Sequence, residues 1–225
     1  SAGEGSLQQR VSGELPTAYD HCRALCIQIP GSTAAWSLYS AVLGRARFKR
    51  PDERWVLRAA LREPDSAPIT LAVAHMCLLS RSFSMAVAEY LQLMQRHPEE
   101  PLIRLCIGAG LIQTVSSRKN PHQPHTALVG FSALSEYARL RSHEQEVEYN
   151  LGRACHQLGL LHLAVTHYAR ALLHTPSTSA TAMPPPPKPP AQDLTREAAH
   201  NLVRIFSCSG NKHLGRQVTR AFMRV

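Results

Sequence analysis

The sequence lacks the features that would place the chain in a membrane or a secretory pathway. Its apolar stretches are short and broken by His, Arg or Gln, whereas a membrane-spanning helix needs about 20 apolar residues in succession. No basic segment followed by an apolar one resembles a signal peptide, and the chain begins at Ser1 without an initiator methionine. We therefore expect a soluble chain that is a piece of a longer polypeptide and has no membrane partner.

The sequence also lacks the paired spacings of metal sites and disulfide frameworks. Its six cysteines include no CxxC pair, and its 12 histidines form no HExxH pattern. We therefore predict no metal and expect reduced, mostly buried thiols, which suit the cytosol or nucleus. Cys77 and Cys155 occupy equivalent places in two predicted helices, where buried core thiols are expected rather than reactive ones.

Acidic residues are few compared with basic ones. There are 16 Asp and Glu residues against 25 Lys and Arg residues, which gives a formal net charge of +9. This charge favours acidic partners such as phosphate backbones or acidic protein segments, without proving that the chain binds nucleic acid. The 225 residues, 44% of them hydrophobic, are enough for a continuous core.

A repeat of fixed period is the strongest positive feature of the sequence. Pro30, Pro64 and Pro98 are spaced 34 residues apart, and each follows a stretch that is typical of a helix. Proline ends a helix because it has no N–H and clashes with the preceding turn. The spacing equals the period of the tetratricopeptide repeat, a pair of antiparallel helices.

One unit, residues 145–178, matches the repeat pattern almost completely. Small residues at Gly152, Ala164 and Ala171 would let two helices approach closely, while Leu151 and Tyr168 would fill the space between hairpins. The matching positions are Leu151, Gly152, Gly159, Ala164, Tyr168, Ala171 and Pro176.

The same register divides the whole chain, with insertions expected around residues 115–124 and at the PPPPKPP stretch within residues 177–193. We predict an all-α fold, a right-handed α-α superhelix of the tetratricopeptide-repeat solenoid type. The expected segments are a partial repeat with a tail at 1–32, repeats at 33–66, 67–100, 101–144 and 145–178, a Pro-rich loop at 179–194, and a terminal hairpin at 195–225.

Candidate binding residues follow from this register, because the first helix of each hairpin lines the groove of such a solenoid. An Asn and an Arg recur at the same spacing in two first helices, which suits the recognition of carboxylates. The alternative is that Asn has a local role and Arg is simply solvated. The predicted partner-binding residues are Tyr149, Asn150, Arg153, His156, His200, Asn201 and Arg204; Glu146, Gln157 and Glu197 are expected on the same faces.

In earlier units the corresponding positions are apolar. They indicate either a groove that holds another protein segment or close packing between repeats. These positions are Leu71, Leu78, Leu102, Leu105 and Ile112.

A stripe of basic residues occupies the last predicted helix. On a helix, residues four positions apart share a face, so this stripe is expected to be exposed, either as a solvated face or as a contact for an acidic surface or for phosphates. Its residues are Lys212, Arg216, Arg220 and Arg224. The residues expected to pack against the preceding hairpin are Leu214, Val218, Ala221, Phe222 and Val225.

No motif of catalysis is visible. The sequence has no Gly-rich phosphate loop, no GxSxG motif and no acidic pair in a pattern that ends a strand. Together with the helical repeat, this predicts a non-enzymatic protein without cofactor or small-molecule substrate.

Three stretches resemble one family. They are EYNLGRACHQLGLLHLAVTHYARAL from Glu148 to Leu172, LCIG from Leu105 to Gly108, and AHNLVRIFSCSGN near the end of the chain. They are similar to the carboxy-terminal repeat array of the tetratricopeptide subunit of general transcription factor IIIC, which serves RNA polymerase III. The segments around Trp36 and from Gln95 to Leu102 extend the resemblance over most of the chain.

The resemblance implies a function that the repeat period alone does not. It implies a nuclear scaffold that binds other subunits of transcription factor IIIC and components of initiation factor IIIB, at genes of the transfer-RNA type. DNA contact would be indirect or auxiliary. The rival hypothesis is an adaptor similar to a co-chaperone that binds an acidic peptide segment.

Overall fold

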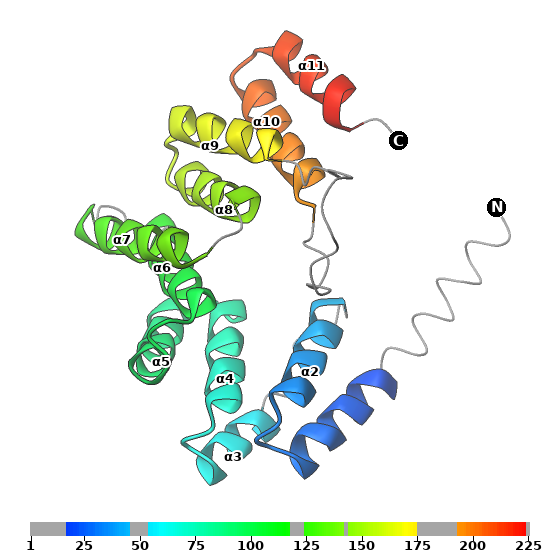
Figure 1. Ribbon diagram of the computed structural model, residues 1–225, viewed down its shortest axis with the longest axis vertical. Helices are drawn as coiled ribbons and strands as arrows, with labels where there is room; N and C mark the ends of the chain where they lie inside the picture. Colours follow the sequence, from blue (N-terminus) through cyan, green and yellow to red (C-terminus); the bar gives the residue numbers. More distant parts are fainter. Residues whose placement is uncertain (1–16, 46–53, 118–123, 142–143, 175–192, 224–225) are drawn as a thin grey trace, which may run out of the picture. The chain divides into compact units, whose positions relative to one another are not determined.

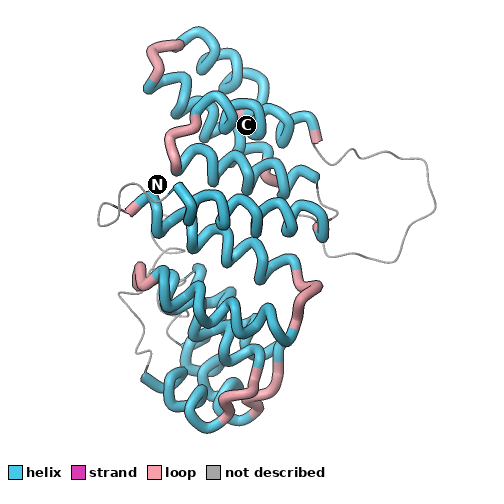
Figure 2. Tube along the Cα trace, turned by 90° about the vertical axis from the view of Figure 1, so that its left-hand side faces the viewer, coloured by secondary structure: helices cyan, strands magenta, loops and turns pink. Residues whose placement is uncertain are grey.

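The computed structural model describes residues 17–45, 54–117, 124–141, 144–174 and 193–223. All regular secondary structure within these ranges is helical (Figure 2). The chain divides into two compact units, Ser1–Pro98 and Glu99–Val225. Among the described helices, none combines the length and the apolar character needed to cross a membrane.

In the described part of the first unit, a helix at residues 17–28 is followed by four further helices in chain order (Figure 1). α4 and α5 pack together as a hairpin, and α2 and α3 both contact α4. The four helices are α2 (Thr33–Arg45), α3 (Arg54–Arg62), α4 (Ala67–Leu79) and α5 (Phe83–Arg96).

An aromatic cluster joins the first three helices of this unit. The Trp36 and Trp55 rings stack with their centroids 5.5 Å apart, and Tyr39 lies edge-on to Trp55 at 5.2 Å. The Trp36 indole N–H donates to the carbonyl of Pro30 at 2.8 Å, and the Trp55 N–H donates to the Tyr19 hydroxyl at 3.3 Å. These contacts bury both indoles and fix α2 and α3 against the helix at 17–28.

The three prolines spaced 34 residues apart, Pro30, Pro64 and Pro98, lie between helices. Pro64 is in the turn between α3 and α4, and Pro98 follows the end of α5. The Arg96 guanidinium binds the Asp65 carboxylate at 2.8 Å, which ties the end of α5 to the turn before α4. Pro176, the matching proline of the unit at 145–178, lies outside the described residues, as does most of the Pro-rich loop.

Within its described residues, the second unit forms three antiparallel hairpins (Figure 1). The helices pair as α6 with α7, α8 with α9, and α10 with α11, and α9 also packs against α10. Their bounds are α6 (Pro101–Ser116), α7 (Pro124–Leu140), α8 (Glu144–Gln157), α9 (Leu161–Leu173), α10 (Thr195–Cys208) and α11 (Lys212–Phe222).

Small residues hold these hairpins together, as predicted for Gly152, Ala164 and Ala171. A Cβ atom on Gly152 would lie 2.8 Å from the ring of Tyr168, so only glycine lets α8 approach that ring. Ala164 and Ala171 are fully buried on α9. In the hairpin before it, a Cβ atom on Gly108 would lie 2.6 Å from the side chain of Leu134. The predicted packing role of these small residues is confirmed.

The insertion expected around residues 115–124 is partly helical. α6 continues through Val115 to Ser116, and α7 begins at Pro124. With 16 and 17 residues, these two helices are longer than the other labelled helices of the described chain. Part of the inserted sequence therefore lengthens the hairpin, and residues 118–123 lie outside the described part.

Candidate partner-binding groove

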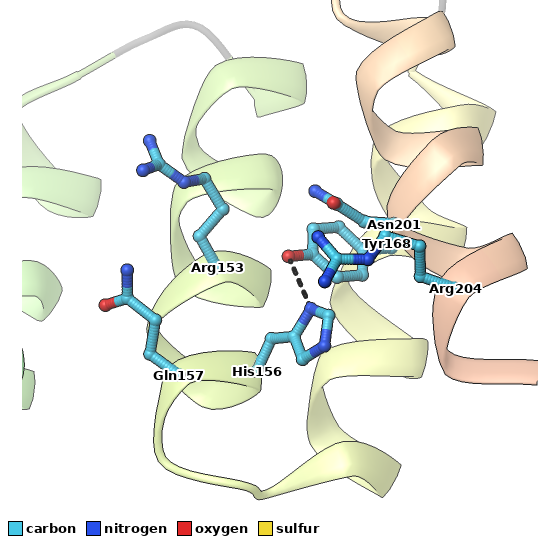
Figure 3. A pocket seen from close by; sticks show the side chains of 6 residues that line it. All are labelled: Arg153, His156, Gln157, Tyr168, Asn201 and Arg204. Atoms are coloured by element: carbon cyan, nitrogen blue, oxygen red, sulfur yellow. Dashed lines mark hydrogen bonds between the residues drawn. The ribbon is translucent and has the colours of Figure 1, made fainter. Parts of the chain in front are cut away.

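A pocket of about 330 Å³ lies between α8 and α10. Figure 3 shows that its side chains come from three helices, with one tyrosine of α9 between the two first helices. We call it the basic pocket; it is lined by Arg153, His156 and Gln157 of α8, Tyr168 of α9, and Asn201 and Arg204 of α10.

Helical periodicity explains why these side chains face the pocket. On α10, Ala198, Ala199, Leu202 and Ile205 are buried, which leaves the face with Asn201 and Arg204 open. On α8, Gly152, Ala154 and Cys155 belong to the buried side, and the pocket residues Arg153, His156 and Gln157 lie at its edge. The pocket is thus built on helices rather than on loops.

The charges in the basic pocket are all of one sign. Arg153 and Arg204 are both exposed, and no carboxylate lines the pocket. Among the ion pairs of the described residues, none involves either guanidinium. The Arg153 guanidinium instead lies 6.0 Å from the centre of the Tyr149 ring, a cation–π arrangement. Both arginines are therefore available to a carboxylate.

His156 and Tyr168 add uncharged groups to the floor of the pocket. Burial lowers the pKa of His156, and the nearby Arg204 lowers it further. Burial raises the pKa of the Tyr168 hydroxyl, which therefore stays protonated. The Tyr168 hydroxyl and His156 Nδ1 lie 3.5 Å apart (Figure 3). An acidic ligand would meet two guanidinium groups beside neutral donors, a combination that favours carboxylates.

A second pocket of about 290 Å³ lies on the same two helices. We call it the Tyr149 pocket; it is lined by Tyr149, Arg196, Glu197, His200, Asn201 and Met223. Asn201 lines both pockets. Together they form what we call the α8–α10 groove.

The structure places six of the seven predicted partner-binding residues on this groove. Asn150 lines neither pocket, because its side-chain amide donates to the Tyr137 hydroxyl at 3.1 Å. Tyr137 in turn donates to the Glu146 carboxylate at 2.9 Å, and Glu146, also expected on the groove face, lines neither pocket. Asn150 therefore links α8 to α7. The six on the groove are Tyr149, Arg153, His156, His200, Asn201 and Arg204.

Sequence reasoning missed three residues of the groove. Tyr168 was expected only to fill the space between hairpins, yet its hydroxyl reaches the basic pocket. The polar end of a buried tyrosine is the signal that could have revealed this. Arg196 precedes the predicted groove positions on α10, and Met223 follows the end of α11. No pattern in the sequence distinguishes Met223 from its neighbours.

Three residues of the basic stripe are exposed on α11. These are Lys212, Arg216 and Arg220, whereas Arg224 lies outside the described residues.

The prediction for the opposite face of α11 was partly wrong. Val218 packs against the core as expected, and so does Met223. Leu214 and Phe222, however, are 38% and 36% exposed, and Ala221 is exposed as well. Among the labelled helices, α11 mainly contacts α10. The buried strip of α11 is therefore narrow and centres on Gly215 and Val218. Val225 lies outside the described residues.

The apolar positions predicted in earlier first helices do not form one exposed strip. Ile112 is fully buried, and it contacts the core shared by α6 and α7. Leu71, Leu78 and Leu105 are partly buried, and Leu102 is 42% exposed. For Ile112, packing between helices is therefore the correct explanation.

No disulfide joins any of the six cysteines, and Cys22, Cys26, Cys106 and Cys155 are buried. Cys77 is half-buried, and Cys208 is exposed. Burial raises the pKa of the Cys155 thiol, so the core thiol expected there is confirmed. Within the described ranges, no three His, Cys, Asp or Glu side chains are placed to hold a metal ion.

Comparison with known sequences identifies three relatives. The chain is 34% identical over 195 residues to general transcription factor 3C polypeptide 3 of Homo sapiens. The aligned residues cover 86% of this chain and 21% of the relative. It is 30% identical to the transcription factor tau subunit sfc4 of Schizosaccharomyces pombe, over 69% of this chain and 16% of the relative. It is 26% identical to the transcription factor tau 131 kDa subunit of Saccharomyces cerevisiae, over 65% of this chain and 14% of the relative. No protein-family model matches the sequence.

Solved structures resemble the chain in fold. One is a chain of the APC/C hetero-tetramer Cut9-Hcn1, with a TM-score of 0.58 and 16% identity over 92% of this chain and 37% of that one. Another is BtubC from P. vanneervenii, with a TM-score of 0.58 and 16% identity over 96% of this chain and 89% of that one. These similarities confirm the predicted fold class, an all-α tetratricopeptide-repeat solenoid.

The sequence relatives confirm the resemblance to the tetratricopeptide-repeat subunit of transcription factor IIIC. All three carry the names of transcription factor subunits rather than of enzymes. The chain spans about a fifth or less of the length of these relatives.

Proposed function

We propose that this chain, a homologue of the tetratricopeptide-repeat subunits of transcription factor IIIC, is a non-enzymatic scaffold segment of such a subunit in the nucleus. It binds other subunits of that factor and components of initiation factor IIIB. By bridging DNA-binding subunits and the initiation factor, it supports RNA polymerase III transcription of genes of the transfer-RNA type. DNA contact is indirect or auxiliary, and the exposed Lys212, Arg216 and Arg220 are available to an acidic surface.

One observation supports a specific binding mode. The basic pocket presents Arg153 and Arg204 from two adjacent first helices, and no carboxylate lines it. Positive charge without an internal partner attracts an acidic segment and raises the rate of encounter. We propose that an acidic segment of a partner subunit occupies the α8–α10 groove.

The same pocket supports the rival hypothesis, an adaptor similar to a co-chaperone that holds an acidic peptide. The two functions differ in what the groove captures in the nucleus. Affinity purification of the full-length subunit from nuclear extract separates them. Companion subunits of transcription factor IIIC support the scaffold, and heat-shock chaperones in their place support the adaptor.

The groove itself is tested by reversing its charge. We expect Arg153→Glu combined with Arg204→Glu to weaken co-purification of at least one companion subunit by about tenfold, because two positive charges become negative at one contact. The matched control is Arg58→Glu with Arg62→Glu, two exposed arginines of α3. Equal recovery of every companion by both double variants would contradict the acidic-segment proposal.

A further inference from the structure

The two pockets of the α8–α10 groove differ in chemistry. The basic pocket carries Arg153 and Arg204. The Tyr149 pocket is floored by Tyr149 and Met223, which are both partly buried and pack against the core around Tyr168. At its rim, Arg196 and Glu197 have opposite charges, so this end of the groove has no excess of either sign. Its floor suits an apolar side chain rather than a second carboxylate.

The two pockets are continuous. Asn201 lines both, and the Tyr149 ring at one end lies 5.9 Å from the Tyr168 ring at the other. His156 lies edge-on to the same Tyr168 ring at 6.1 Å. Rings therefore extend along the floor from the Tyr149 pocket into the basic pocket, and one bound segment can reach both.

The geometry of α10 sets the distance between the two sites. Arg204 lies four residues after His200 and seven after Glu197. At about 1.5 Å per residue, the basic pocket is roughly 6 to 10 Å along the helix from the Tyr149 pocket. An extended peptide advances about 3.3 Å per residue, so two or three residues cover this distance.

We propose that the groove recognises a composite motif in an extended segment of a partner protein: an acidic residue with an apolar residue two or three positions away. This inference rests on the proposed acidic-segment function and adds the second half of the motif. Ion pairs at exposed arginines alone contribute little affinity, because water and salt screen them. Burial of a neighbouring apolar side chain on Tyr149 and Met223 supplies affinity that salt does not screen.

The test measures binding of short synthetic peptides to the 225-residue chain by fluorescence anisotropy. Each fluorescein-labelled Gly-Ser peptide carries an Asp-Glu pair. In one peptide a Leu lies two or three positions from the pair, in another it lies at the far end, and in a third Ser replaces it. We expect the first peptide to bind about fivefold more tightly than the other two, which corresponds to partial burial of one leucine.

Two sets of variants separate the halves of the motif. Met223→Ala should remove the preference for the nearby Leu but leave binding of the Ser peptide unchanged. Tyr149→Ala is the second variant for this pocket, with circular dichroism to verify the fold. Arg153→Gln combined with Arg204→Gln should abolish binding of all three peptides.

The possible failures are distinguishable. Equal affinity for all three peptides, with binding still dependent on the arginines, would overturn the composite motif and leave the acidic-segment proposal intact. If binding does not depend on Arg153 and Arg204, or no peptide binds, both proposals are wrong.

Discussion

At the scale of single residues, Ala164 bears on the stability of the second unit and His156 on the binding of a ligand in its basic pocket. Ala164 is fully buried where α9 meets its neighbours, so no space is left for a larger side chain. His156 sits in the basic pocket with its pKa lowered by burial and by Arg204. The first is a matter of stability and the second a matter of binding.

Replacing Ala164 with Leu should destabilise the fold by about 1 to 3 kcal/mol, because three added carbon atoms must displace packed neighbours. The measurement is chemical denaturation followed by circular dichroism at the helical band. Ala169→Leu on the exposed side of α9 is the matched control, and it should change stability by less than about 0.5 kcal/mol. Equal effects of both substitutions would mean that the repeat register is wrong.

Binding of an acidic peptide should strengthen as the pH falls. Free His156 has a pKa below its usual value and is neutral at pH 7. A bound carboxylate favours the imidazolium, so the pKa of His156 is higher in the complex and a proton is taken up on binding. The added affinity is fully present below the pKa of the free protein and is lost as pH rises through the pKa of the complex.

We expect affinity to be roughly two- to fivefold higher at pH 6.0 than at pH 7.5. The charged and titratable groups around His156 come from all three helices of the pocket: the Arg153 and Arg204 guanidinium groups and the neutral Tyr168 hydroxyl. His156→Gln should remove the dependence, and His200→Gln serves as the control for the histidine of the Tyr149 pocket. If the pH dependence of affinity persists in His156→Gln, a titratable group other than His156 causes it.

At the scale of elements, the turns within three of the hairpins share one backbone conformation. Gly159 between α8 and α9 has φ +76°, and Gly210 between α10 and α11 has φ +79°. In the α4–α5 turn the residue with positive φ is Arg81, with φ 63°. Glycine adopts this conformation without strain, whereas a residue with a Cβ atom does not.

Arg81→Gly should therefore raise the stability of the first unit, by up to about 1 kcal/mol after the entropy that glycine loses on folding is taken into account. Tryptophan fluorescence is a suitable probe, because both tryptophans, Trp36 and Trp55, lie in that unit. Arg81→Ala is the control and should have little effect, since it keeps the Cβ atom. A loss of stability in Arg81→Gly would show that the arginine side chain makes a contact worth more than the strain.

The sequence predicted some elements better than others, for a physical reason. Small residues such as Gly152 and Ala171 identify a hairpin from local pattern alone, because close helix approach requires them. The buried face of α11 could not be identified in the same way. Periodicity shows which residues share a face, but the width of the buried face depends on how many helices flank it. Leu214 and Phe222 share the expected face of α11 but are exposed, because the buried part of that face is narrow.

At the scale of the whole molecule, the fold class and the family resemblance were both predictable. The 34-residue period and the match at residues 145–178 predicted a tetratricopeptide array. The site was predictable in part: repeat register brings Arg153 and Arg204 onto adjacent helices. Asn150 and Met223 were not, because their roles depend on contacts with a neighbouring hairpin and with the end of α11.

The central claim is that the α8–α10 groove holds a segment of a partner subunit. The most direct test places a photo-crosslinking amino acid at Gln157, an exposed residue of the basic pocket, in the full-length subunit. Ser135, exposed on α7, is the control position. After irradiation in nuclear extract, mass spectrometry should identify crosslinks from position 157 to an acidic segment of another transcription factor IIIC or IIIB component, and none to that segment from position 135. Crosslinks from position 157 only to chaperones, or the same products from both positions, would contradict the account.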